Sequence, residues 1–308
     1  MPQLTSLAGL RPQGTVAAAV ATHGTGVHSG QPVRLVLRPA PVDHGIVFQR
    51  TDVAPRRGRV RARWDQVVDT RLCTVIANSE GTRVSTVEHL LAALRACGID
   101  NALVDLDGPE VPILDGSSAQ WLALIDSAGV VAQAARRREI MIEQPLRVDD
   151  GQRWAMLLPA AAPRFTVDID FDDPVVGQQH YDLVLDTTRF RNEIAAARTF
   201  GFMRDIRALQ ATGRTLGGSL DNAVVIDDGR VLNPGGLRFP DEFVRHKLLD
   251  CIGDLYLAGA PVVGRLVASR PGHALNVQLV RALHANPSAW RWSTQALRPA
   301  LHDATLAA

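Results

Sequence analysis

Three polar residues, His246, Asp250 and Asp254, recur every four positions in the segment FPDEFVRHKLLDCIGDLYLAG. In an α-helix this spacing places the three side chains along one side. A histidine and a carboxylate one turn apart can both bind a divalent cation, and His89 from an earlier predicted helix would supply a third ligand. Three protein ligands leave zinc a fourth position for water, which is the arrangement of a hydrolytic site rather than a structural one.

The same spacing also fits a simpler interpretation, a solvated ion pair on the surface of a helix. On a helical wheel Val244, Leu248 and Ile252 fill one arc, and His246 and Asp250 lie in the opposite arc. A polar arc can face either water or an active-site cleft. Periodicity therefore leaves both interpretations open.

Glu88 stands directly before His89 in RVSTVEHLLAAL, and its carboxylate also has two interpretations. The run Ser85-Thr86-Val87-Glu88 has the spacing of a capping box, in which Glu88 would only satisfy a backbone N–H. Alternatively Glu88 is a general base, because zinc hydrolases need a carboxylate that accepts a proton from water without binding the metal. Adjacent residues on a helix point about 100° apart, which favours one ligand and one base over two ligands.

Two further residues could take part in such chemistry. His273 lies in a tight turn, Pro271-Gly272-His273-Ala274, between a predicted strand and a predicted helix. A carboxylate such as Asp254 would orient this histidine and raise its pKa, so that a protonated general acid would be present near neutral pH. Thr199, in ARTFGF, offers a hydroxyl beside aromatic residues, although alone this pattern is typical of a packed strand end.

The composition is that of a globular protein and excludes several classes of partner. Hydrophobic residues make up 46% of the 308 residues, and 33 basic against 32 acidic residues leave a net charge of +1, so no global field favours nucleic acid. Three cysteines without CxxC spacing indicate free thiols in a reducing compartment. The N-terminus lacks a basic region before an apolar run, and the run Val16–Ala21 is too short to span a bilayer. We expect a cytoplasmic protein without an integral membrane segment.

The order of predicted elements indicates an α+β fold. In the first half, β-rich runs precede helices over about 86–97 and 117–128. The second half repeats this pattern before a long helix from about 240 to 259. The charged run Ala134–Arg138 reads as a break between the halves.

We therefore predict an N-terminal α+β domain at 1–134, a C-terminal α+β domain at 139–290 and a tail at 291–308. The domains should be similar, each a mainly antiparallel sheet with helices on one face, and the helices should pack together between the two sheets. Val87-Glu88-His89-Leu90 and Val244-Arg245-His246-Lys247 open the two main helices alike, which hints at an internal duplication. Facing domains would bring both histidines to one interface, where ligand sites commonly lie.

Several long motifs make the prediction more specific. The stretches STVEHLLAAL, NALVDLDGPEVPILDGSSAQWL, ARTFGFMRDI, GGSLDNAVVIDDGRVLNPGGLRF, DEFVRHKLLDCIGDLYL and GHALNVQLV resemble, in this order, the UDP-3-O-acyl-N-acetylglucosamine deacetylase family. Members of this family are zinc amidases that take the committed step of lipid A synthesis in Gram-negative bacteria. The resemblance covers about residues 15–285, and motifs of this length are far more specific than a single short pattern.

The resemblance implies a role for each residue of the predicted catalytic group. The zinc ligands would be His89, His246 and Asp250. The remaining roles would fall to Glu88 as general base, His273 as general acid, Asp254 as the carboxylate that orients it, Thr199 as oxyanion stabiliser and Lys247 as a substrate contact. One Zn²⁺ per chain is implied, and Fe²⁺ stays an alternative in the cell because two imidazoles and a carboxylate also suit it.

The resemblance also implies a binding site for an acylated UDP-sugar. Asp170 and Phe171 stand at the place of the family's nucleotide-binding Asp–Phe pair. Arg153 and Arg270 stand where some relatives carry lysine, which keeps the charge but changes the geometry of the contact. The other implied substrate contacts are Phe200, Phe202, Met203, Ile206 and Leu220 in a hydrophobic passage for the acyl chain, and His28 in GTGVHSG near the site. Leu220 replaces a phenylalanine of some relatives.

The implied reaction is hydrolysis of the substrate's N-acetyl group, which gives acetate and a free 2-amino sugar nucleotide. A zinc peptidase or another nucleotide-sugar hydrolase would share the metal chemistry but gives no reason for the apolar segment Phe200–Ile206. A non-catalytic alternative is a metal-stabilised binding module for an acylated nucleotide sugar, which would need neither Glu88 nor His273. We expect a monomer whose partner is the small-molecule substrate.

Overall fold

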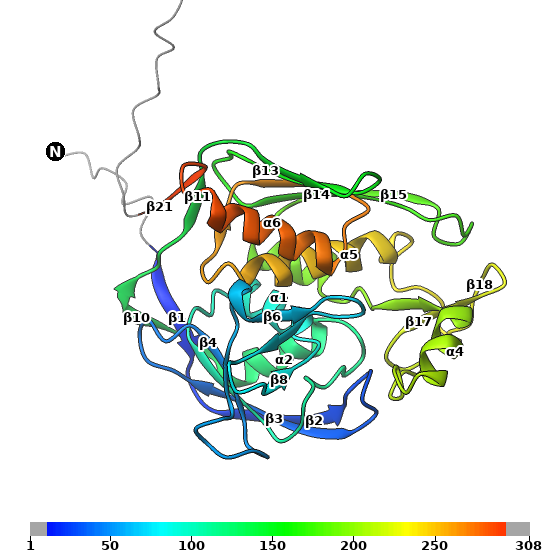
Figure 1. Cartoon of the computed structure of the whole chain (residues 1–308), viewed down its shortest axis with the longest axis horizontal. Helices are drawn as coiled ribbons and strands as arrows, with labels where there is room; N and C mark the ends of the chain where they lie inside the picture. The colour runs from blue at the N-terminus through cyan, green and yellow to red at the C-terminus, as the bar shows by residue number, and fades with distance from the viewer. Residues whose placement is uncertain (1–10, 294–308) are drawn as a thin grey trace, which may run out of the picture.

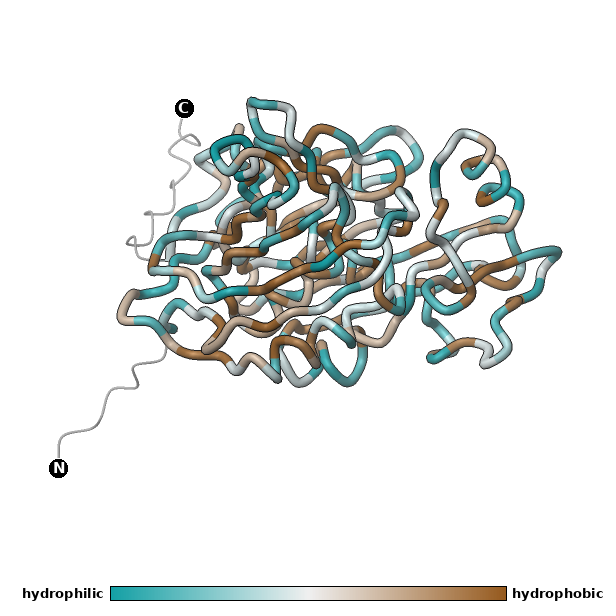
Figure 2. Tube along the Cα trace, turned by 90° about the horizontal axis from the view of Figure 1, so that it is seen from below, coloured by the Kyte–Doolittle hydropathy of each residue, from teal (hydrophilic) through white to brown (hydrophobic). Residues whose placement is uncertain are grey.

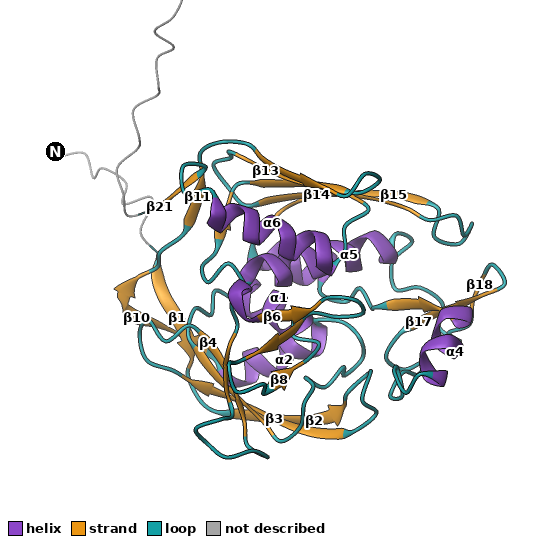
Figure 3. Cartoon of the chain, viewed as in Figure 1, coloured by secondary structure: helices purple, strands orange, loops and turns teal. Residues whose placement is uncertain are grey.

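The computed structural model describes residues 11–293 of the chain. Its fold is mixed α+β: two five-stranded sheets form the outer layers, and most of the helices lie between them (Figures 1 and 3). The α-helices of the described residues are α1 (Glu88–Ala96), α2 (Ala119–Ala128), α3 (Thr187–Arg189), α4 (Met203–Ala211), α5 (Glu242–Tyr256) and α6 (His273–Ala285). The main helices predicted from the sequence are thus confirmed, with ends that shift by a few residues.

The first five-stranded sheet has the spatial order β2-β3-β9-β4-β5. Its strands are β2 (Val20–Thr25), β3 (Pro32–Pro39), β4 (Ile46–Arg50), β5 (Arg59–Arg61) and β9 (Ala102–Leu106). Of these five strands β9 comes last along the chain, yet it lies in the middle of the sheet, where it pairs antiparallel with β3 and parallel with β4. The edge strands β2 and β5 pair antiparallel with their neighbours.

The second five-stranded sheet repeats this topology. Its order is β12-β13-β20-β14-β15, and the strands are β12 (Leu146–Asp149), β13 (Trp154–Leu158), β14 (Arg164–Asp170), β15 (Gln178–Val184) and β20 (Arg265–Ser269). Here too the last strand, β20, lies in the middle, antiparallel to β13 and parallel to β14. Both edge pairings are antiparallel. Each sheet is therefore mixed, with one parallel pair among otherwise antiparallel ones.

Smaller sheets complete the described chain. One pairs β1 (Pro12–Val16) with β10 (Val130–Arg136), and another joins β6 (Val67–Asp69), β7 (Val75–Ala77) and β8 (Arg83–Val84). A third holds β11 (Ile140–Ile142), β19 (Val262–Val263) and β21 (Trp290–Trp292). The last consists of β16 (Phe200–Phe202), β17 (Val224–Asp227) and β18 (Arg230–Val231), which lie with α4 to one side of the layers (Figure 1).

Two segment ends differ from the expectation. The charged run Ala134–Arg138 is partly a strand, because β10 extends to Arg136 and pairs with β1. Arg291 and Trp292, which we placed in the tail, belong to β21 and pair with β11. Residues 294–308 of the predicted tail, and residues 1–10 of the N-terminus, lie outside the described residues.

The helical layer forms the centre of the core. Nearly all residues of α1 and α5 are buried, because α5 contacts the strands β14 and β15 as well as α1 and α6. Hydrophobic stretches run through the strands and helices of the layers, whereas the outer loops are mostly hydrophilic (Figure 2). None of the described helices is long and apolar enough to cross a membrane.

Gly253 allows α1 and α5 to approach closely. A Cβ atom at this position would lie 2.0 Å from the backbone oxygen of Glu88, so no other residue fits without moving one of the helices. Gly253 lies on α5 between Asp250 and Asp254. The crossing point of the helices thus brings Glu88 and His89 of α1 beside Asp250 and Asp254 of α5.

Candidate metal and catalytic site

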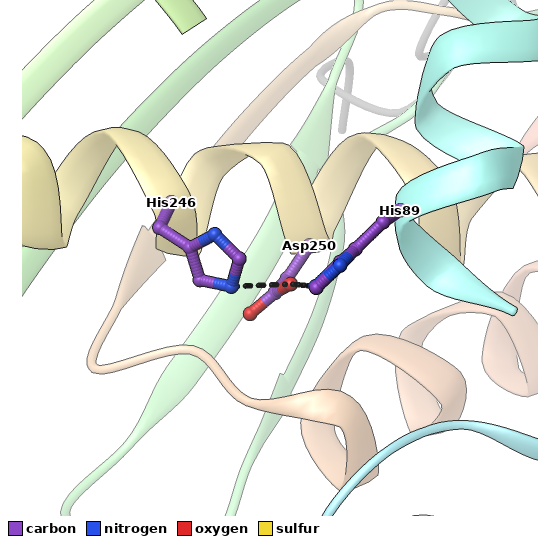
Figure 4. A group of neighbouring side chains, drawn as sticks. All are labelled: His89, His246 and Asp250. Atoms are coloured by element: carbon purple, nitrogen blue, oxygen red, sulfur yellow. Dashed lines mark ion pairs between the residues drawn. The ribbon is translucent and has the colours of Figure 1, made fainter. Parts of the chain in front are cut away.

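His89, His246 and Asp250 converge where α1 crosses α5 (Figure 4). The Oδ1 atom of Asp250 lies 3.3 Å from Nε2 of His246 and 3.6 Å from Nε2 of His89. One candidate ligand atom from each residue falls within 4.8 Å of the others, as binding one cation requires. The predicted cluster is therefore brought together, with two members on one helix and the third on the other.

The solvated ion pair is excluded by burial. His246 and Asp250 are each 2% exposed, and Asp254 is fully buried. Polar residues of α5 face inward because α1, rather than solvent, covers this side of the helix. The helical wheel separated polar from apolar residues correctly but carried no information about the second helix.

Asp250 carries an incomplete set of hydrogen bonds. Its Oδ2 atom accepts a hydrogen bond from Nζ of Lys247 at 3.1 Å, whereas Oδ1 has no hydrogen-bond partner among the described residues. Leaving a buried carboxylate oxygen unsatisfied is costly. Because this oxygen points at the Nε2 atoms of both histidines, a cation bound between the three groups would compensate it. The residues present thus fit a metal ion.

The protonation states of the cluster also suit a cation. Burial lowers the pKa of His246 to about 4, so the ring is neutral at pH 7. Its Nδ1 atom lies 3.1 Å from the carbonyl oxygen of Ala197, so Nδ1 is the donor and the lone pair of Nε2 faces Asp250. Although burial acts in the opposite direction, His246 and Lys247 hold the pKa of Asp250 well below its usual range. Two nitrogens and an ionised oxygen suit Zn²⁺ and Fe²⁺.

Glu88, His273 and Asp254 form a second buried group beside the cluster. The Oε1 atom of Glu88 lies 3.7 Å from Nε2 of His273, and Nδ1 of His273 is 2.9 Å from Oδ2 of Asp254. The capping-box interpretation of Glu88 is wrong: no side chain caps the start of α1, and Oε2 of Glu88 instead accepts a hydrogen bond from the backbone N–H of Thr74 at 3.2 Å. Predicted acid and base residues therefore face each other.

Opposing effects set the charges of this pair. Burial raises the pKa of Glu88 above its ordinary value, although the nearby histidines act in the opposite direction. Burial disfavours protonation of His273, yet the carboxylates of Asp254 and Glu88 outweigh it and raise the pKa of this histidine to about 9. A carboxylate with a raised pKa accepts protons more readily, and a histidine with a raised pKa holds one at neutral pH. These are the properties of a base and an acid.

Two residues that sequence reasoning missed complete the surroundings of Asp254. The Oγ1 atom of Thr74 donates to Oδ1 of Asp254 at 2.6 Å, and Nδ2 of Asn276 donates to Oδ2 at 2.9 Å. Asn276 follows His273 by three residues on α6, so its spacing carried a weak signal. Thr74 lies 180 residues from Asp254, and no local pattern marks it.

A buried ion pair positions the segment that carries Thr199. Arg198 donates from Nε and Nη2 to the two carboxylate oxygens of Glu242 at 2.8 and 3.0 Å. Glu242 is the first residue of α5, so the pair ties Ala197, whose carbonyl holds His246, to the helix that bears the ligands. Sequence reasoning did not single out either partner.

A cavity of about 590 Å³ opens onto these groups. Glu88, His89, His246, Asp250 and His273 line part of it. The predicted substrate contacts that line it as well are His28, Phe171, Thr199, Phe200, Phe202, Met203, Ile206, Leu220 and Lys247. The metal cluster, the acid–base pair and the apolar segment thus share one space.

The residues expected around the nucleotide are only partly brought together. Phe171 contacts Phe200 and Phe202, with ring centroids 5.7 and 6.0 Å apart. Asp170 forms an ion pair with Arg270 next to it. Arg153 instead forms an ion pair with Asp150 in an exposed turn and does not line the cavity.

His28 lies on a loop that Glu110 anchors. The carboxylate of Glu110 accepts hydrogen bonds from the backbone N–H groups of His28 and Ser29, at 3.0 and 2.8 Å, and from Oγ1 of Thr86 at 2.9 Å. Thr86 has a φ of 59°, which is unusual for a β-branched residue, just before α1 begins. Glu110 therefore links the loop of His28 to the start of the helix that carries Glu88.

Comparison with known proteins agrees with this geometry. Residues 13–285 match the model of the family described as UDP-3-O-acyl N-acetylglycosamine deacetylase. This chain belongs to that family. Proteins named UDP-3-O-acyl-N-acetylglucosamine deacetylase from Shewanella loihica and Shewanella woodyi are each 50% identical to it over 280 residues. The aligned region covers 90% of this chain and 91% and 92% of those relatives. The deacetylase family match spans every residue of the buried cluster.

Proposed function

We propose that this chain hydrolyses the N-acetyl group of a UDP-3-O-[(3R)-3-hydroxyacyl]-N-acetylglucosamine. The products would be acetate and the free 2-amino sugar nucleotide, in the committed step of lipid A biosynthesis. The observation that carries the proposal is the unsatisfied Oδ1 atom of Asp250, which faces two histidines beside a buried acid–base pair. Membership of the deacetylase family supplies the substrate class.

His89, His246 and Asp250 would hold one Zn²⁺ per chain, with Fe²⁺ as an alternative in the cell. When bound, such an ion supplies Lewis acidity, which lowers the pKa of water and polarises an amide carbonyl. Lys247 neutralises the second carboxylate oxygen of Asp250 and lies over the ring of Phe200, with Nζ 5.6 Å from its centroid. From this position the ammonium group of Lys247 would contact a substrate oxygen.

Glu88 and His273 would divide the proton transfers between them. Glu88 accepts a proton from the attacking water, which its raised pKa favours. His273 keeps its proton at neutral pH and donates it to the amine, because an amine leaves readily only after protonation. Asp254 fixes the Nδ1–H of His273 and so presents Nε2 to the cavity. The Thr199 hydroxyl would stabilise negative charge on the carbonyl oxygen.

The cavity would bind the acyl chain along its apolar wall. Phe200, Phe202, Met203, Ile206 and Leu220 line that wall and offer no charge. Phe171 extends the aromatic surface towards Asp170 and Arg270, which would contact the uridine diphosphate, and His28 would lie near the sugar. Arg153 would have to leave Asp150 to join them.

The remaining proposals concern organisation. The shared strand order of the two large sheets supports two similar domains, at 1–134 and 139–290, that contribute His89 and His246 to one interface. Cys73, Cys97 and Cys251 are free, which supports a reducing, cytoplasmic location. We also propose a monomer that binds only its small-molecule substrate.

A non-catalytic binding module is the alternative to test. Glu88→Ala should abolish release of acetate while the protein keeps one metal ion, because Glu88 is not among the proposed ligands. Product mass spectrometry and metal analysis measure the two properties separately. Unchanged turnover would contradict the role of Glu88, and a wild-type protein that binds substrate without losing its acetyl group would favour the binding module.

A further inference from the structure

Thr74 closes a ring of contacts around the acid–base pair. Its backbone N–H donates to Oε2 of Glu88 at 3.2 Å, and its Oγ1 donates to Oδ1 of Asp254 at 2.6 Å. Asp254 contacts His273 at 2.9 Å, and His273 faces Glu88 at 3.7 Å. Each of the four residues therefore touches two others. Thr74 is the only one of them that carries no ionisable group.

The two donors of Thr74 belong to one rigid unit. Because threonine is branched at Cβ, its side-chain torsion is restricted, and the hydroxyl keeps a nearly fixed position relative to the backbone N–H. Thr74 is fully buried and lies just before β7, so the sheet β6-β7-β8 holds its backbone. One residue outside both helices therefore holds the carboxylate of Glu88 on α1 and that of Asp254 on α5 in fixed relative positions.

We propose that Thr74 is a positioning residue of the deacetylase reaction. Its hydroxyl orients the Asp254 carboxylate, and through it the ring of His273, relative to the carboxylate of Glu88. This inference rests on the proposed function, in which Glu88 and His273 act on the same amide. Residues that orient a catalytic group in this way commonly contribute 10–100-fold, by the scale of outer-shell partners of metal sites, ~1–3 kcal/mol.

A purely structural role makes the opposite prediction for two substitutions. Valine has the shape of threonine without the hydroxyl, whereas serine keeps the hydroxyl and loses the methyl group. If Thr74 only fills space, its hydroxyl does not matter for turnover, so Thr74→Val should leave kcat near the wild-type value. Thr74→Ser, which loses a buried methyl group, should then be the worse variant. If the hydroxyl positions Asp254, the order is reversed. Both variants keep the backbone N–H that binds Glu88.

Thr166 provides a matched control. Its Oγ1 atom donates to Oδ1 of Asp182 at 2.6 Å, the same distance as in the Thr74–Asp254 pair, and it is 5% exposed. It lies on β14 and does not line the cavity. Thr166→Val removes a hydrogen bond of the same length from a buried threonine, here to a partly exposed carboxylate, and should leave turnover unchanged.

The experiment measures kcat, KM and metal content of the full chain on a UDP-3-O-acyl-N-acetylglucosamine. We expect Thr74→Val to lower kcat by about 10–100-fold with little change in KM and with one metal ion retained. Thr74→Ser should keep kcat within about threefold of wild type, because the donor remains. Thr74→Cys, with a weak S–H donor, should fall between them and replaces Thr74→Val if that variant does not fold.

A second readout does not depend on turnover. In the metal-free protein, the Nδ1–H resonance of His273, observed by NMR with ¹⁵N-labelled histidine, should shift in Thr74→Val and not in Thr166→Val. A Thr74→Val or Thr74→Cys variant with wild-type kcat would overturn the inference, as would a Thr74→Ser variant that loses as much activity as either. A wild-type protein without deacetylase activity would instead contradict the proposed function.

Discussion

The α1–α5 crossing and the segment 200–232 line the same cavity but are built differently. At the crossing, charged and polar side chains are nearly inaccessible, and most are fixed by contacts of 2.6–3.7 Å. In the segment, α4 has no buried residue, and Leu216, Leu220 and Leu232 are 54%, 40% and 38% exposed. Proton transfer needs fixed geometry, whereas an apolar chain can be held by a wall that adapts.

The largest expected effect follows from removing a proposed ligand at the crossing. Asp250→Ala leaves two histidines and no carboxylate among the proposed ligands, so no negative charge offsets that of a divalent cation. We expect metal content well below one ion per chain and turnover no higher than that of metal-stripped wild type. Asp168→Ala, on an exposed position of β14, serves as the control and should keep both. Full activity in Asp250→Ala would contradict the assignment of the metal site to the α1–α5 crossing.

Removal of the acid should be nearly as damaging but should spare the metal. His273→Gln keeps a polar side chain without a titratable proton, so we expect kcat to fall by about 10²–10⁴-fold. Metal analysis should still find one ion per chain, because His273 is not a proposed ligand. A variant that loses metal together with activity would contradict the separation of ligands from acid–base residues.

The pH dependence of stability tests the crossing without any substrate. The folded pKa of His273, about 9, is above its unfolded value, so protonation stabilises the fold below about pH 6.5, and this stability is lost as the pH rises through 9. Chemical denaturation of the metal-free protein should therefore show a loss of up to about 3 kcal/mol over this range. His273→Gln should flatten the curve, and an unchanged slope in that variant would contradict the assignment.

The smallest effect is expected at the wall. Leu220→Ala should lower kcat/KM for a long-chain substrate by about tenfold, because apolar contacts with the acyl chain are lost. Turnover of a short-chain substrate and the thermal midpoint should hardly change, since Leu220 is 40% exposed. Leu216→Ala is the matched control, because Leu216 does not line the cavity. An equal loss of kcat/KM with both chain lengths would show that Leu220 affects the hydrolytic step rather than the binding of the acyl chain.

The two regions also differ in how well the sequence predicted them. Both helices of the crossing were predicted, because the sequence of a helix repeats its polar and apolar residues with the helical period. The burial of His246 and Asp250 was not, because it depends on α1, which lies more than a hundred residues earlier. Family motifs, rather than periodicity, decided between solvent and cleft for these residues.

Thr74 and the Arg198–Glu242 pair were missed for the same reason. Their partners lie 180 and 44 residues away, and hydrogen bonds over such separations leave no local pattern. At Arg136 the local pattern was misleading in the other direction, because a run of arginines reads as a charged break although β10 extends to Arg136. Local sequence patterns predicted the helices and strands, whereas the contacts between them could be identified only in the folded structure.

The most direct test is to titrate Zn²⁺ into metal-stripped protein while the products of a UDP-3-O-acyl-N-acetylglucosamine are followed by mass spectrometry. We predict that loss of a single acetyl group rises with added metal and saturates at one equivalent, and that Asp250→Ala stays inactive throughout. Loss of the acyl chain in place of the acetyl group, or activity independent of both metal and Asp250, would contradict the account.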